Sequence, residues 1–373
     1  MDHPVISADS HVVEPHDLWQ VRIDPKFRDR APKLSREADT DRLVFEEAEL
    51  PPVGLLAGCA RGDDEVRLEG RWEQDVFPGG YDPARRLDDL AKDGVDGEVL
   101  FPTIAMQLYR VRDFDFRAAL FEAYNTWLAE FVAKDPGIFK GAGMLTEEDP
   151  EWAAGEMRRC KELGLSTVML PQVPGEEVSY SDARFDPIWS TAVECGFPVN
   201  FHAATTRDEK RAWSAGTPTD GVLACTEVQR VILDMILFGT FDRYPELRII
   251  SVENEAGWAA PMIQRADFVW RRSLKLKRPT TMVCQEAPSH YLHHNVRITF
   301  MRDRAAILCK DIIGEGTMMW GNDFPHHVST WPESRKVLAD IFAGEPEETT
   351  ARLVGGNAAE LYGFDLARLG HGA

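Results

Sequence analysis

Four side chains that can hold a metal ion stand at the ends of short apolar segments. Asp9 and His11 close the first segment, His202 closes one in the middle of the chain, and Asp323 follows one near its end. Asp9 and His11 are two residues apart, so the alternation of a strand points both toward one ion. The pattern predicts a mononuclear divalent-metal site of Asp9, His11, His202 and Asp323. Turn-capping aspartates and a core histidine bonded to a carbonyl are the alternative interpretations.

Three residues are candidates for catalysis. Asp323 could bind the metal and also accept a proton from a metal-bound water. Glu253 ends another apolar segment, and a buried acid is costly unless it is paired or bound to metal. Capping of the following helix is an equally weighted role for Glu253. Of the adjacent His326 and His327, we favour His326 as the residue that orients a ligand or contacts the substrate.

These residues need a scaffold that brings distant strand ends together. Eight short, apolar and often β-branched runs are predicted as strands, and segments with helical spacing separate them. The predicted strands are Val5–Ala8, Glu98–Phe101, Gly141–Leu145, Thr167–Leu170, Val199–Phe201, Arg248–Val252, Val296–Phe300 and Met318–Trp320. The predicted helices are Pro83–Asp93, Phe116–Ala133, Glu151–Leu163, Ala183–Glu194, Gly221–Phe238, Ala256–Ser273, Arg302–Ile313, Pro332–Ala343 and Pro346–Tyr362.

Strands that alternate with helices indicate βα units, and eight such units favour a closed barrel over an open sheet. Barrel enzymes build their sites at the C-terminal ends of the strands, where all four predicted metal ligands fall. The sequence therefore predicts an α/β fold, a (β/α)8 TIM barrel with long loop insertions over the C-terminal face. Residues 1–373 are expected to form a single domain, with excursions at 17–81 and 203–220 near the active site.

The composition restricts the partners and the compartment. With 42 basic and 62 acidic residues, the formal net charge of −20 repels nucleic acids and anionic membranes. The six cysteines are scattered without a C-x-x-C pair, as in a reducing compartment. We see neither a signal peptide nor a run long enough to span a membrane. A cytoplasmic enzyme that acts on a small molecule is expected.

Seven motifs along the chain carry a resemblance to a known family: Ala8–His11 with Glu14 and Pro15, Arg85–Phe101, Tyr124–Trp127, Phe185–Trp189, Phe201–His202, Trp320–His326 and Asn357–Tyr362. Taken jointly, they resemble the amidohydrolase superfamily, in the amidohydrolase-related group that includes aminocarboxymuconate semialdehyde decarboxylase and resorcylate decarboxylase. The resemblance covers nearly the whole chain and implies one divalent ion, commonly zinc or manganese, held at the positions of Asp9, His11, His202 and Asp323. It implies a homodimer only in so far as similar proteins are frequently dimers. The decarboxylases typically carry a histidine where Glu253 stands here.

Three functions fit these residues. The first is hydrolysis of a small, cyclic or aromatic carbonyl compound by a water activated on a metal, with Zn2+ favoured and Mn2+ as the alternative; Asp323 accepts the proton and Glu253 protonates the leaving group. The second is non-oxidative decarboxylation of a carboxylated aromatic or enol. We place it second because an anionic Glu253 would repel the substrate carboxylate, although Arg110 or Arg207 could offset that charge. The third is a barrel that binds metal or ligand without turnover.

Overall fold

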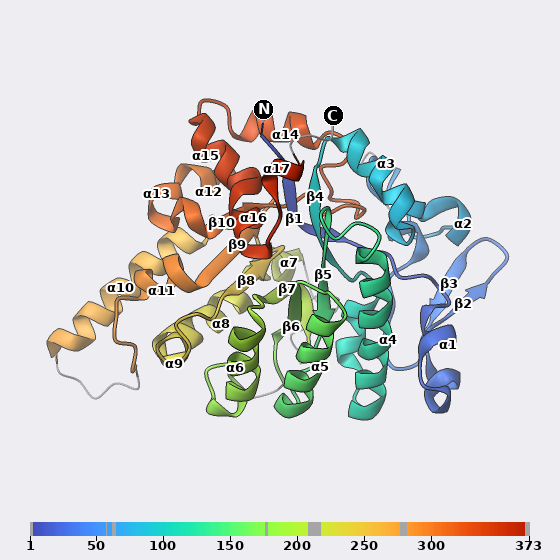
Figure 1. Cartoon of the computed structure of the whole chain (residues 1–373), viewed down its shortest axis with the longest axis horizontal. Coiled ribbons are helices and arrows are strands. Elements are labelled where there is room, and N and C mark those ends of the chain that lie inside the picture. The colour runs from blue at the N-terminus through green and yellow to red at the C-terminus, as the bar shows by residue number, and fades with distance from the viewer. Residues whose placement is uncertain are drawn as a thin grey trace.

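Eight short apolar segments form one parallel sheet whose strand order follows the chain (Figure 1). The computed structural model describes residues 3–56, 58–61, 65–175, 178–207, 218–276 and 282–369. All eight predicted strands are confirmed, with ends that move by a few residues. The strands are β1 (Ile6–His11), β4 (Gly97–Phe101), β5 (Phe139–Met144), β6 (Thr167–Val173), β7 (Val199–Thr206), β8 (Ile249–Val252), β9 (Val296–Phe300) and β10 (Met318–Trp320).

The first and last strands of this sheet lie side by side and nearly close it into a TIM-type barrel. The backbone N–H of His11 donates to the Phe324 carbonyl at 2.7 Å, and that of Asp323 donates to the Asp9 carbonyl at 2.8 Å. Gly321 allows this close approach, since a Cβ at that position would lie 2.5 Å from the Cβ of Asp9. The closing seam of the barrel therefore runs through three of the predicted metal ligands.

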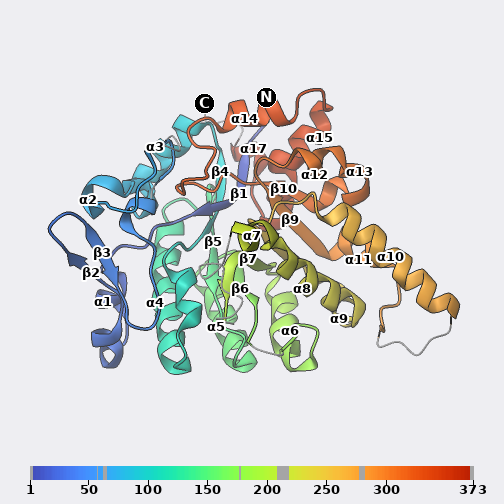
Figure 2. The same cartoon turned by 180° about the vertical axis from the view of Figure 1, so that it is seen from behind.

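Helices cover the outside of the barrel (Figure 2). Asp82, Asp113 and Asp149 begin α3, α4 and α5, because each side chain accepts backbone N–H groups of the first turn. The predicted helix Pro83–Asp93 has the same bounds in the structure. The larger helices are α3 (Pro83–Asp93), α4 (Phe114–Val132), α5 (Pro150–Glu162), α6 (Asp186–Cys195), α8 (Cys225–Leu237), α10 (Ala259–Leu276), α11 (Pro288–Asn295) and α14 (Ser334–Ile341).

Several helical segments differ from the sequence prediction. The predicted helix Pro346–Tyr362 is divided by a π-helical turn at Arg352–Gly356, and α11 was not predicted at all. The predicted helix Arg302–Ile313 is also divided in two. The shorter helices are α1 (Leu18–Arg22), α2 (Trp72–Asp75), α7 (Pro218–Leu223), α9 (Thr240–Arg243), α12 (Arg304–Leu308), α13 (Lys310–Ile313), α15 (Glu347–Ala351), α16 (Asn357–Tyr362) and α17 (Leu366–Leu369).

The excursion between β1 and α3 contains more regular structure than the sequence indicated. Besides α1 and α2 it holds an antiparallel hairpin of β2 (Lys33–Arg36) and β3 (Asp41–Val44). The excursion reaches the end of β10, where the Cys59 N–H donates to the Pro325 carbonyl at 3.2 Å. Cys59 also joins Phe77, Phe324 and Trp331 in a small apolar cluster. In the second predicted excursion, β7 continues to Thr206 and α7 starts at Pro218, while residues 208–217 lie outside the described parts.

Two expectations from composition can be compared with the structure. All six cysteines are free thiols, and Cys59 and Cys160 are buried. In the portion of the chain that is described, no helix has both the length and the apolar character needed to cross a bilayer.

Candidate metal centre

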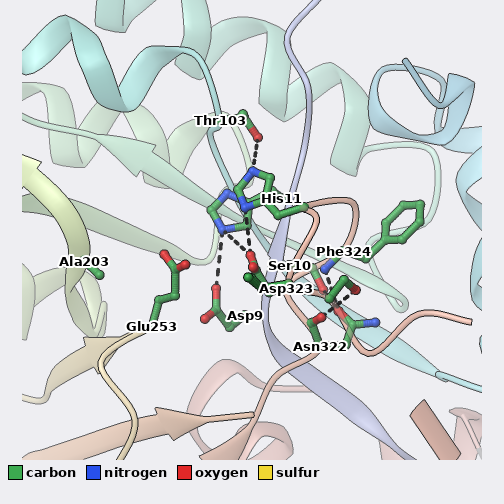
Figure 3. A network of polar contacts seen from close by, with 12 residues as sticks. Asp9, Ser10, His11, Thr103, Ala203, Glu253, Asn322, Asp323 and Phe324 are labelled. Carbon is green, nitrogen blue, oxygen red and sulfur yellow. Dashed lines mark hydrogen bonds and ion pairs between the residues drawn. The ribbon is translucent and has the colours of Figure 1, made fainter. Parts of the chain in front are cut away.

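Asp9 and His11 on β1, His202 on β7 and Asp323, three residues after β10, lie close together, and Figure 3 shows Asp9, His11 and Asp323. The sequence placed His202 at the end of its strand, but β7 continues for four residues to Thr206. His11 Nε2 is the hub of the cluster. It lies 3.2 Å from His202 Nε2, 3.2 Å from Asp323 Oδ1 and 3.6 Å from Asp9 Oδ1. The potential ligand atoms form two sets that share His11, one with Asp9 and His202 and one with Asp323 and His326, and within each set the atoms lie within 4.8 Å of one another.

A register shift in β1 contributes to this placement. Ser7 pairs with Glu98 and Ser10 pairs with Leu100. Between these two pairs β1 therefore contains one residue more than β4. The sequence argument assumed unbroken alternation from Asp9 to His11. Instead, the irregular stretch lies at Asp9 itself, and both side chains still reach the cluster.

Backbone carbonyls fix the tautomers of both imidazoles. His11 Nδ1 lies 2.8 Å from the carbonyl oxygen of Pro102, and His202 Nδ1 lies 3.0 Å from that of Ala203. A carbonyl can only accept a hydrogen bond, so each Nδ1 carries a proton and each neutral ring presents a lone pair at Nε2. The two Nε2 atoms therefore face each other as acceptors, and His11 Nε2 also faces two carboxylate oxygens.

A divalent cation satisfies this arrangement better than a proton does. Asp9 Oδ1 and Asp323 Oδ2 are buried and have no hydrogen-bond partner among the residues that the structure describes. One proton between the imidazoles would leave both oxygens unsatisfied, which is costly in a buried site. Ligands held at about 2.1 Å from one ion lie about 3.0 to 3.4 Å apart, close to the separations around His11. The cluster thus has the donor set and the spacing of a divalent-metal site.

The pKa values of the two histidines follow from burial and neighbouring charge. Burial, together with the charge of His326, lowers the pKa of His11 to about 4. Burial also opposes a charged His202, but the carboxylate of Asp9, 3.6 Å from His202 Nε2, together with Glu253 outweighs it and raises the pKa of His202 to about 9. In the metal-free protein His202 therefore holds a proton that a bound ion would displace.

His326 is an imidazolium by the logic of its hydrogen bonds. The Thr103 hydroxyl donates its single proton to the Val12 carbonyl at 2.7 Å, so it accepts from His326 Nε2, which is 3.0 Å away. His326 Nδ1 lies 2.9 Å from Asp323 Oδ1, and a carboxylate oxygen also accepts. Both ring nitrogens therefore carry protons. Burial opposes the charged ring, but Asp323 outweighs this effect and raises the pKa of His326.

Glu253 reaches the cluster from the end of β8. Its Oε2 lies 3.5 Å from His202 Nδ1, and 20% of its side chain is exposed, while the side chain of His202 is fully buried. Burial, with the negative charge of Asp323, raises the pKa of Glu253 to about 8, so this carboxyl group is largely neutral near pH 7. In the turn between Glu253 and α10, Asp303 Oδ2 accepts the N–H groups of Ala256 and Gly257 at 2.8 and 2.6 Å.

Comparison with known proteins places this chain in a family. The sequence profile of the amidohydrolase family matches residues 38–364. The chain belongs to the amidohydrolase family. This amidohydrolase is 25% identical over 311 residues to a 2-amino-3-carboxymuconate-6-semialdehyde decarboxylase of Dictyostelium discoideum, covering 81% of this chain and 82% of the relative.

Two further comparisons connect this amidohydrolase with decarboxylases. It is 28% identical over 261 residues to a gamma-resorcylate decarboxylase of Polaromonas sp. strain JS666, which covers 64% of this chain and 74% of the relative. Its fold matches the crystal structure of 5-carboxyvanillate decarboxylase from Novosphingobium aromaticivorans DSM 12444, complexed with manganese and 4-hydroxy-3-methoxy-5-nitrobenzoic acid. That match has a TM-score of 0.70 and 21% identity, and covers 97% of this chain and 96% of the other.

The prediction of a hydrolase is wrong, because the relatives found by sequence are decarboxylases and support the alternative function. The error came from treating Glu253 as an anion that repels a substrate carboxylate. With its pKa raised to about 8, Glu253 carries little charge near pH 7. His326 adds a positive charge beside Asp323 that the sequence could not reveal.

Residues that sequence reasoning missed support the strands that carry the Asp and His cluster. Arg86 is fully buried, pairs with Glu98 at 2.7 Å and donates to the carbonyl of His11 at 2.9 Å. Asn322 Oδ1 accepts from the hydroxyl groups of Ser7 and Ser10 at 3.0 and 2.8 Å. Arg86 and Asn322 stand in two of the motifs that carry the resemblance, Arg85–Phe101 and Trp320–His326, but the sequence assigned a role to neither.

Three other residues considered in the sequence lie outside the cluster. Arg207 pairs with Glu147 at 3.0 Å and with Glu148 at 2.7 Å, so its charge is compensated and does not await a substrate. His327 is exposed and backs onto Gly58, where a Cβ would lie 2.7 Å from the His327 Cβ. Arg110 ends a short 3-10 helix (Ala105–Arg110) that follows β4.

Proposed function

We propose that this protein is a metal-dependent, non-oxidative decarboxylase of a small carboxylated aromatic or enol compound. The two decarboxylases among its relatives support this reaction class. We further propose Asp9, His11, His202 and Asp323 as the metal ligands. Manganese is preferred to zinc, because the solved 5-carboxyvanillate decarboxylase of the same fold is complexed with manganese.

One observation carries the proposal: His202 Nε2, Asp323 Oδ1 and Asp9 Oδ1 converge within 3.6 Å of His11 Nε2, and two proton-bearing groups stand beside them. Asp9, His11, His202 and Asp323 have side chains that are 6% exposed or less. Glu253 and His326 are 20% and 15% exposed. Glu253 and His326 therefore form the face that a substrate can reach, above the buried ligand set.

The residues of this face divide the reaction between them. A divalent ion, when bound, supplies positive charge that offsets the substrate carboxylate and an oxygen next to it. The His326 imidazolium adds a fixed positive charge on the same side, and Thr103 and Asp323 hold its ring through both nitrogens. Asp323 stays ionised, since His326 outweighs burial and holds the pKa of Asp323 below its usual range.

Glu253 is the proposed proton donor. Loss of CO2 breaks one carbon–carbon bond and leaves the electron pair on the ring or enol carbon, which then takes a proton. A carboxyl group with a pKa near 8 is protonated at neutral pH and suited to give that proton. Its partial exposure allows solvent to replace the proton after each turnover.

The test is CO2 release by manganese-loaded protein from 2,6-dihydroxybenzoate, 5-carboxyvanillate and 2-amino-3-carboxymuconate semialdehyde. In deuterated water, the product should carry one deuterium at the carbon that lost CO2. His202→Ala should abolish turnover together with bound metal, and Glu253→Gln should retain metal but slow deuteration. Metal-loaded protein that releases no CO2 from any of these compounds would sink the proposal.

A further inference from the structure

A second polar cavity lies at the opposite end of the barrel from the Asp and His cluster. It has a volume of about 300 Å³, within the range of small-ligand pockets. It opens where β7, β8 and β9 begin, and α16 closes one side. Its walls include Arg248, Arg297, Glu246, Glu360, Phe197 and Leu361.

The two arginines of this cavity point to the same face of the sheet. Arg297 on β9 pairs with Ile250 on β8, and Arg248 lies two residues before Ile250. Side chains two residues apart on a strand share a face, and paired residues on neighbouring strands do so as well. Both guanidinium groups therefore reach the same cavity.

Neither guanidinium group has a carboxylate partner among the described residues. Arg248 uses Nη1 to donate to the carbonyls of Pro245 and Leu247, both at 3.1 Å. Arg297 uses Nη1 to donate to backbone carbonyls, the shortest being that of Val296 at 2.8 Å. In both side chains Nε and Nη2 make no hydrogen bond with the described parts of the chain. Each arginine thus offers one edge of its fork to the cavity.

This is unusual in a chain with a formal net charge of −20. The two fully buried arginines among the described residues are each paired with a carboxylate, Arg86 with Glu98 and Arg117 with Glu148. At the barrel base, burial and the nearby charge of Arg248 lower the pKa of Arg297, and Glu360 offsets only part of this effect. Two positive groups that repel each other in a half-buried cavity favour an anion between them.

We propose that this cavity binds a small phosphate monoester or free phosphate. Two guanidinium groups carry two positive charges and two forks of N–H donors. They therefore match the charge and the oxygen geometry of a dianion better than they match a single carboxylate. The apolar walls at Phe197 and Leu361 leave room for a small organic group. The site is separate from the metal centre, so the proposal does not depend on the decarboxylase function.

Glu246 and Glu360 sharpen the proposal because both also line the cavity. If their only role were to neutralise the arginines and no phosphate bound there, Glu360→Gln would lower the melting temperature and the change would not depend on phosphate. If the cavity binds phosphate, Glu360→Gln removes a repulsive charge and should tighten binding. The sign of this change separates a binding site from a structural charge network.

The experiment measures the melting temperature of the full chain with 10 mM inorganic phosphate, glycerol 3-phosphate or acetate, each against sodium chloride of equal ionic strength. Both phosphates should raise the melting temperature by about 2 °C if they are present at about tenfold their Kd. Acetate should not. The shift should disappear in Arg297→Met and Arg248→Met, persist in His202→Ala, and grow in Glu360→Gln.

Arg272→Met is the matched control, because Arg272 is an exposed arginine on α10 far from the cavity in sequence. No shift in the wild-type protein, or a shift that survives both Arg248→Met and Arg297→Met, overturns the proposal. A shift lost in His202→Ala would place the phosphate at the metal centre and overturn it as well. Should one arginine variant fail to fold, the other decides.

Discussion

Replacing Gly321 by alanine tests whether the seam between β1 and β10 sets the geometry of the metal centre. The added Cβ would lie 2.5 Å from the Cβ of Asp9, 3.1 Å from its backbone nitrogen and 3.2 Å from its Cα. Carbon atoms in contact prefer a separation of about 3.5 Å, so the two backbones must part by about 1 Å. All three crowded atoms belong to Asp9, whose carbonyl accepts the Asp323 N–H. The separation therefore moves two proposed ligands.

The size of the effect follows from this displacement. Metal–ligand distances hold to within about 0.2 Å, so a shift of about 1 Å removes Asp9 from the ion. Disturbing the groups that only support a ligand already costs about 10- to 100-fold in metal affinity, and Gly321→Ala should cost at least as much. Overpacking in a tight core costs about 1 to 3 kcal/mol. In a chain of this length the melting temperature should fall by about 2 to 6 °C.

Metal content by elemental analysis and manganese affinity by competition with a chelator provide the assay, with circular dichroism as the check of fold. Gly155→Ala is the matched control, since a Cβ on Gly155 in α5 meets nothing within 4 Å. Replacing a glycine inside a helix by alanine should raise the free energy of unfolding of that variant by about 0.5 to 1 kcal/mol and leave metal binding unchanged. Wild-type manganese affinity in Gly321→Ala would refute the reasoning about the seam.

Three further results are expected. Thr103→Val removes the acceptor of His326 Nε2. Because hydrogen bonds to charged groups contribute about 1.5 to 3 kcal/mol, kcat should fall about 10- to 100-fold and the pKa of His326, measured by NMR, should drop. Thr103→Ser should restore both kcat and the pKa. Burial raises the pKa of Glu14 from 4.5 to about 7, so its stability contribution is complete below pH 4.5 and is lost as pH rises through 7. Urea unfolding should therefore show wild-type stability falling by about 3 kcal/mol more than that of Glu14→Gln over this window, and parallel curves would exclude the effect. Manganese at 100 times its Kd should add about 2.7 kcal/mol to the free energy of unfolding, and no gain would argue against a native metal site; His202→Ala should abolish the gain.

The barrel could be predicted because most of its strands and helices are marked by residues within the element or next to it. Short β-branched runs, Asp149 followed by Pro150, and Gly94 after the last turn of α3 each mark an element by its own chemistry. The hairpin of β2 and β3 escaped prediction because its strands are only four residues long and polar, with burial supplied by the surrounding excursion. Helix Pro288–Asn295 was missed because three histidines hide its apolar face, which carries Tyr291 and Leu292.

The metal centre could be predicted only as a set of residue types. Asp9, His11, His202 and Asp323 could be identified as candidates because they lie in or just after the C-terminal parts of strands, which meet at one end of a barrel. The protonation states of these side chains could not be predicted from the sequence. The carbonyl of Pro102 sets the tautomer of His11, and no pattern in the sequence connects the two. The same limit applies to Glu253, whose raised pKa comes from burial and from Asp323 on another strand.

Backbone strain gathers at the residues that carry the proposed chemistry. Ala204, Glu253 and Asp323 have positive φ values of 61°, 58° and 54°. Ala204 lies within β7, Glu253 follows β8 directly and Asp323 comes three residues after β10. Non-glycine residues adopt this conformation at a cost of about 1 to 3 kcal/mol, which persists only when surrounding contacts enforce it. For Asp323 that contact is its N–H bond to Asp9, the same bond that closes the barrel. A glycine would relieve the strain but would remove the carboxylate, so the fold keeps a strained residue where the metal site needs its side chain. Ion binding, barrel closure and the strained turn after β10 are therefore three aspects of one local structure.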